Sequence, residues 1–94
     1  MEAAGSCLGA VITAGRESYD RVRHLPRILA VGPAEIEDLS QAGRRAIVAK
    51  LARALRAERS RGRAGHWTYD LNRHIALSQA YAAETAAGRR GFEP

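Results

Sequence analysis

Apolar side chains in the middle of the sequence recur every three or four residues, which is the repeat of one face of an α-helix. We expect this helix over residues 43–61, closed by Gly62 or Gly65 in the left-handed conformation. No segment alternates apolar and polar residues over the length of a strand. The pattern predicts an all-α fold, a small antiparallel bundle of three to four helices. The apolar stripe of the central helix is Ile47, Val48, Leu51 and Leu55.

Proline and glycine divide the remaining chain into further helices. We expect a first helix over residues 3–24, which ends near Leu25 because Pro26 disfavours helical backbone in the residue before it. Pro33 suits the first position of a short helix, and acidic residues follow it where the positive end of the helix dipole lies. The segment 40–43 then separates this short helix from the central one.

A last helix is predicted over residues 71–87, with Asp70 as its N-cap and Gly88 at its end. Residues 88–94 are then expected to form a loose tail. The apolar stripe predicted for this helix is Leu71, Ile75, Ser78 and Ala82, flanked by His74, Leu77 and Tyr81.

The 94 residues leave room for one domain, so we treat residues 1–94 as a single helical domain. Alanine occupies 19 positions and aromatic residues make up 5% of the chain, so the core is thin and a homodimer or another partner would supplement it. The single cysteine, Cys7, forms no intrachain disulfide; we expect a core position for it, with an intermolecular disulfide or a reactive thiol as the alternatives.

The sequence shows no signal peptide and no apolar run near the ~20 residues that a membrane span needs. We therefore expect a cytoplasmic protein that does not bind a membrane.

Charge divides the chain into two unequal parts. Residues 1–40 carry four Arg against six acidic residues, whereas residues 41–94 carry eleven basic residues against four acidic ones. Eight of those eleven lie between Arg44 and Arg63, with Glu58 as the only acid among them. Since a merely solvated face would place Glu one turn from Arg to form ion pairs, this excess favours contact with an anion.

Most of these basic residues lie on the face of the helix opposite the apolar stripe. Arg44 lies nearer the stripe, so its side chain has to pair with an acid or extend to solvent. Trp67 and Tyr69 follow in the next loop, where they either stack on exposed bases or fill the core beneath the turn. Packing of Tyr69 on His74 is a further alternative. The candidate residues for binding nucleic acid or another anion are Arg45, Lys50, Arg53, Arg56, Arg59, Arg61, Arg63 and Trp67.

The sequence offers no catalytic constellation. His24, His66 and His74 stand in no metal-ligand spacing, so we expect no metal, no cofactor and no enzymatic activity. His74, Ser78 and Tyr81 share a helix face and are expected to form a structural cluster rather than a proton relay. The segment 33–45 only loosely imitates a helix-turn-helix.

These patterns predict a non-catalytic binding protein whose arginine-rich helix contacts an anionic partner, with nucleic acid favoured. Arginine suits phosphate because its planar guanidinium donates two parallel hydrogen bonds. The alternative is a protein-interaction module, such as an adaptor, regulator or inhibitor. Its arginines would then dock on an acidic surface of a larger protein complex.

Overall fold

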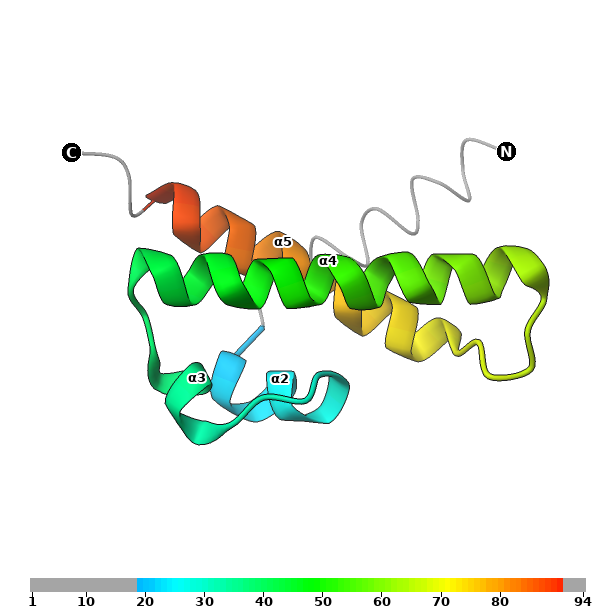
Figure 1. Cartoon of the computed structure of the whole chain (residues 1–94), viewed down its shortest axis with the longest axis horizontal. Coiled ribbons are helices and arrows are strands. Elements are labelled where there is room, and N and C mark those ends of the chain that lie inside the picture. Colours follow the sequence, from blue (N-terminus) through cyan, green and yellow to red (C-terminus); the bar gives the residue numbers. More distant parts are fainter. Residues whose placement is uncertain (1–18, 91–94) are drawn as a thin grey trace.

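The computed structural model describes residues 19–90, and all regular structure in this part of the chain is helical. The helices are α2 (Arg21–Ile28), α3 (Pro33–Glu37), α4 (Gln41–Ala64) and α5 (Leu71–Arg90). Figure 1 shows α5 running back across the long α4 after the yellow loop, with α2 and α3 together below α4. The predicted small all-α bundle is confirmed. The first 18 residues of the sequence, with Cys7 and most of the helix expected over 3–24, lie outside the described residues.

The core lies where α2, α4 and α5 meet. Three of the four predicted apolar residues of α4 are buried there, whereas Val48 is half-buried. The buried row of α4 continues instead at Glu58, which a hydrophobic pattern does not predict. Tyr19, Ile28 and Tyr81 pack around this cluster. The fully buried apolar side chains are Leu25, Ile47, Leu51, Leu55, Leu77 and Ala80.

Both ends of α4 have side-chain or glycine caps. The Ser40 hydroxyl accepts a hydrogen bond from the Gly43 amide at 3.1 Å, so the helix begins at Gln41, two residues earlier than predicted. Residues 41–43 are therefore the first turn of α4 and not the turn of a helix-turn-helix. At the other end Gly65 adopts φ 63°, which confirms the predicted left-handed cap.

Helix α2 corrects the prediction for the first segment. Asp20 caps it by accepting from the Val22 amide at 3.0 Å, and the Asp20 amide donates to Nδ1 of His24 at 2.8 Å. The helix then continues through Pro26 to Ile28, so the expected end near Leu25 is wrong. Because the Leu25 side chain is fully buried, its packing outweighs the local preference before proline.

Helix α5 begins as predicted but buries a different face. Oδ1 of Asp70 accepts from the Asn72 amide at 2.9 Å, which confirms the cap. The predicted apolar stripe is wrong, because Leu71 is 57% exposed and Leu77, Ala80 and Glu84 form the buried row.

The end expected at residue 87 is also wrong, since α5 continues through Gly88 to Arg90. Three residues of the predicted tail are thus helical, and residues 91–94 lie outside the description.

Candidate functional site

Glu84 is a buried acid that joins α5 to the segment containing α2. Arg21 Nε donates to Glu84 Oε2 at 2.8 Å, and the Tyr19 hydroxyl donates to the same oxygen at 2.9 Å. Burial raises the pKa of the Glu84 carboxyl, but the hydrogen bonds from Arg21 and Tyr19 outweigh burial and leave this pKa below its ordinary value. Arg44 Nη1 lies 3.4 Å from Glu84 Oε1, so of the two alternatives expected for Arg44, pairing and extension to solvent, the structure shows pairing.

Glu58 is a second buried acid, placed near the C-terminal end of α4. Its carboxylate accepts from Arg73 Nε at 2.6 Å, from Arg61 Nη2 at 2.8 Å and from the Asp70 amide at 3.0 Å. The hydrogen bonds from Arg73 and then Arg61 lower the pKa of Glu58 to about 2. This carboxylate therefore holds the loop and the start of α5 against α4.

Lys50 has a carboxylate partner as well. Its Nζ lies 2.5 Å from Glu35 Oε2 and 3.4 Å from the Ala30 carbonyl oxygen, so it joins α4 to α3 and the segment before it. Lys50 and Arg61 both belong to the predicted binding residues. Because each already neutralises a carboxylate, we leave both out of the binding surface proposed below.

The other five predicted cations lie on the remaining side of α4, and we call this surface the open arginine face. All five side chains are exposed, and none forms an ion pair with a described residue. At about 100° per residue they spread over roughly 120° of the helix circumference. The structure thus gathers these guanidinium groups on one surface that no described carboxylate neutralises. The open arginine face consists of Arg45, Arg53, Arg56, Arg59 and Arg63.

Trp67 lies in the loop between α4 and α5 and is 87% exposed. Its ring stacks on that of His66, with the centroids 5.9 Å apart and the planes 24° from parallel. The interpretation that Trp67 fills the core is therefore wrong. The aromatic ring of this loop that lies against α4 is that of Tyr69.

Of the alternatives for Tyr69, the structure shows the contact with His74. The Tyr69 hydroxyl lies 2.9 Å from Nδ1 of His74, and the two rings meet edge to face. A Cβ at Gly62 would lie 2.9 Å from Cε1 of Tyr69, so glycine at this helical position lets the ring lie against the α4 backbone.

A pocket of about 350 Å³ opens at this end of α4, and no acidic side chain lines it. Sequence reasoning named its arginines but missed the contribution of α5. The only sequence signal for that contribution was the spacing of Tyr69 and His74. This spacing indicates that the two side chains meet but not that they face α4. The lining residues are Arg59, Gly62, Arg63, Tyr69 and His74.

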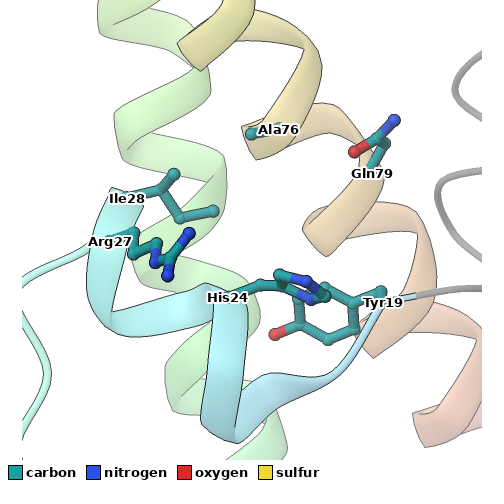
Figure 2. A pocket seen from close by; sticks show the side chains of 6 residues that line it. All are labelled: Tyr19, His24, Arg27, Ile28, Ala76 and Gln79. Atoms are coloured by element: carbon teal, nitrogen blue, oxygen red, sulfur yellow. The ribbon is translucent and has the colours of Figure 1, made fainter.

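His24 lines a different pocket. This second pocket, of about 220 Å³, lies between α2 and α5 (Figure 2). The centroids of the Tyr19 and His24 rings lie 6.0 Å apart there. The Ser78 hydroxyl donates to the backbone carbonyl of His74 at 3.0 Å, so the suggested trio forms no relay through the imidazole. In residues 19–90, no group of three or more His, Cys, Asp or Glu side chains is placed to hold a metal ion.

Among the described helices, none combines the length and apolar character that crossing a membrane requires. Comparison of the chain with protein-family models, with curated proteins and with solved structures gives no match.

Proposed function

We propose that this protein binds nucleic acid without catalysis, through the open arginine face of α4. The supporting observation is that five exposed guanidinium groups on this face have no ion-pair partner among the described residues. The strongest described carboxylate contacts, at Glu35, Glu58 and Glu84, go to other cations. Contacts between the arginines of this face and a nucleic-acid backbone would neutralise phosphates and release counterions, which gives affinity with little sequence preference.

Repulsion within the face supports an anionic partner. Arg53, Arg56, Arg59 and Arg63 follow one another at spacings of three, three and four residues, so neighbouring charges lie about one helical turn apart. A phosphate chain laid along the face would remove this repulsion. Exposed Trp67 provides a stacking surface beyond the end of the helix, and such stacking contributes ~1–3 kcal/mol per base at single-stranded sites.

A protein-interaction module is the second candidate, favoured by an apolar groove beside the arginines. This groove of about 400 Å³ lies between α4 and α5, with Val48, Ala52 and Thr85 among its lining residues and Arg45 at its edge. An acidic protein with an apolar contact of its own would match both features.

The test is a titration of labelled single-stranded and duplex oligonucleotides at several salt concentrations. Five phosphate contacts predict a slope of log K against log salt of about −4.5 for duplex and about −3.5 for a single strand. In the double variant Arg53→Ala/Arg56→Ala, the duplex slope should become less steep by about 1.8, because two contacts are lost.

The matched control is Arg23→Ala/Arg27→Ala, which removes the same charge from exposed positions of α2. This variant should retain the parental slope. If the α2 variant makes the slope less steep by as much as the α4 variant does, binding follows net charge and the proposed face is wrong. If no oligonucleotide binds at low salt, nucleic acid is excluded and an acidic protein becomes the better candidate.

A further inference from the structure

The pocket at the end of the open arginine face combines two arginines of that face with a histidine of α5. Arg59 and Arg63 stand one turn apart on α4, and His74 faces them from α5. Gly62 also lines the pocket, and its lack of a side chain lets the Tyr69 ring lie against α4 there. At the other end of the face, Arg45 lines the apolar groove between α4 and α5 instead.

Hydrogen bonding fixes which nitrogen of His74 can serve a ligand. Nδ1 is engaged with the Tyr69 hydroxyl at 2.9 Å. When this hydroxyl donates to Nδ1, the hydrogen of the neutral ring is on Nε2, which has no hydrogen-bond partner among the described residues. In this tautomer Tyr69 acts as a positioning residue, because it engages Nδ1 and leaves Nε2 of His74 as the donor.

The acidic residues close to this pocket in sequence are occupied. Glu58 accepts from Arg61 and Arg73, and Asp70 caps α5. Two arginines without an ion pair among the described residues and one imidazole therefore line an open pocket whose lining has no acidic side chain. Its volume of about 350 Å³ lies at the lower end of the ~300–1,000 Å³ range of small-ligand pockets.

We propose that this pocket binds a terminal phosphate of a nucleic-acid strand, a phosphate monoester, while the rest of the strand follows the open arginine face. The inference rests on the proposed function. A phosphate monoester carries about −1.5 to −2 charges and three terminal acceptor oxygens at neutral pH, whereas an internal phosphate carries one charge. The guanidinium groups of Arg59 and Arg63 and Nε2 of His74 supply donors from two helices. This arrangement suits the three terminal oxygens of a phosphate monoester better than the two of an internal phosphate. The open face also stops here, because α4 ends at Ala64.

The experiment compares three strands of one sequence, bearing a 5′-phosphate, a 3′-phosphate or hydroxyl groups at both ends. We expect one phosphorylated strand to bind about tenfold more tightly than the hydroxyl strand, because it gains charge-assisted hydrogen bonds. The end that gives this ratio identifies which terminal phosphate the pocket accepts. Equal affinity for all three strands overturns the pocket and leaves the proposed function standing, whereas failure of all three to bind overturns both.

Variants then place the effect in the pocket. Arg59→Ala and His74→Gln should each bring the affinity ratio close to one, and Tyr69→Phe should reduce it while keeping the ring against Gly62. Arg45→Ala, at the opposite end of the face, should weaken all three strands and preserve the ratio. Helical circular dichroism of each variant establishes that it is folded. A tenfold ratio that survives both Arg59→Ala and His74→Gln contradicts the assignment.

Discussion

Two sides of α4 carry the same kind of side chain and use it differently. On one side Arg44, Lys50 and Arg61 each reach a carboxylate. On the other, the five residues of the open arginine face reach none among the described residues. The difference lies in the acidic residues. Packing of α3 and α5 brings Glu35 and Glu84 to the first side, and Glu58 of α4 itself lies there too, whereas no described carboxylate forms an ion pair with the second side.

This comparison separates stability from binding. Carboxylates that are buried need their cations, so substitutions on the paired side should change the free energy of unfolding. Exposed guanidinium groups without partners contribute little to folding, so substitutions on the open face should change affinity instead. The predictions below test this separation in order of decreasing effect on stability.

The largest effect is expected for Glu84→Ala. This change leaves the Arg21 guanidinium buried without its carboxylate, and removing one partner of a buried pair costs about 3–5 kcal/mol. Since small domains are stable by only ~5–15 kcal/mol, the melting temperature should fall strongly. Urea unfolding followed by circular dichroism measures the loss.

Glu37→Ala is the matched control, because Glu37 is exposed and forms no ion pair with a described residue. Its effect should stay within about 0.5 kcal/mol. If Glu84→Ala is no more harmful than this control, the buried pair does not hold α2 against α5.

The second prediction concerns the dependence of stability on pH. The pKa of Glu58 is about 2 in the folded protein against an ordinary value of 4.5, so the unfolded chain binds more protons between these values. Stability from Glu58 is therefore complete above about pH 5 and is lost as the pH falls towards 2. Glu58→Gln should be less stable at pH 7 and should depend less on pH over this window. Unfolding curves measured from pH 7 to pH 2 check both expectations, and an equally steep acid dependence in the variant would contradict them.

Local patterns predicted α4 and both caps of the 65–70 loop, because these depend on neighbouring residues. Apolar spacing located Ile47, Leu51 and Leu55, while Gly65 and Asp70 mark ends through their own backbone and side-chain chemistry. The sequence located helix α5 but predicted the wrong buried face for it. It is rich in alanine, so its apolar period is weak, and its buried row includes Glu84.

The buried acids show why the candidate site was only partly predicted. Glu84 is buried because Arg21, 63 residues earlier, pairs with it, and Glu58 because Arg73 does. No local pattern encodes these two pairings, nor the approach of His74 to the end of α4. The pairing of Arg61 with Glu58, three residues earlier on the same helix, is a local contact that the sequence could have indicated. The open arginine face itself followed from helical geometry alone, and its partner remains a proposal.

A smaller loss of stability is expected for Lys50→Ala. The Lys50–Glu35 pair is partly exposed, so solvent screens it and its contribution is well below that of a buried pair. The melting temperature should fall by about 2–3 °C in low salt, with a smaller fall in high salt. Thermal unfolding at the two salt concentrations measures this, and a loss as large as that of Glu84→Ala would show that the two pairs are equivalent.

The smallest effect, and one of opposite sign, is expected for Arg56→Ala on the open face. Arg56 stands three residues from both Arg53 and Arg59, so removing its charge relieves two repulsions, and alanine is at least as good a helix former as arginine. The free energy of unfolding should therefore stay constant or rise by about 0.2–0.5 kcal/mol in low salt, and the gain should vanish in high salt. Urea unfolding in both buffers measures the change. A clear loss of stability in low salt would mean that Arg56 already has an anionic partner within the chain, and that the two sides of α4 do not differ in the way the comparison requires.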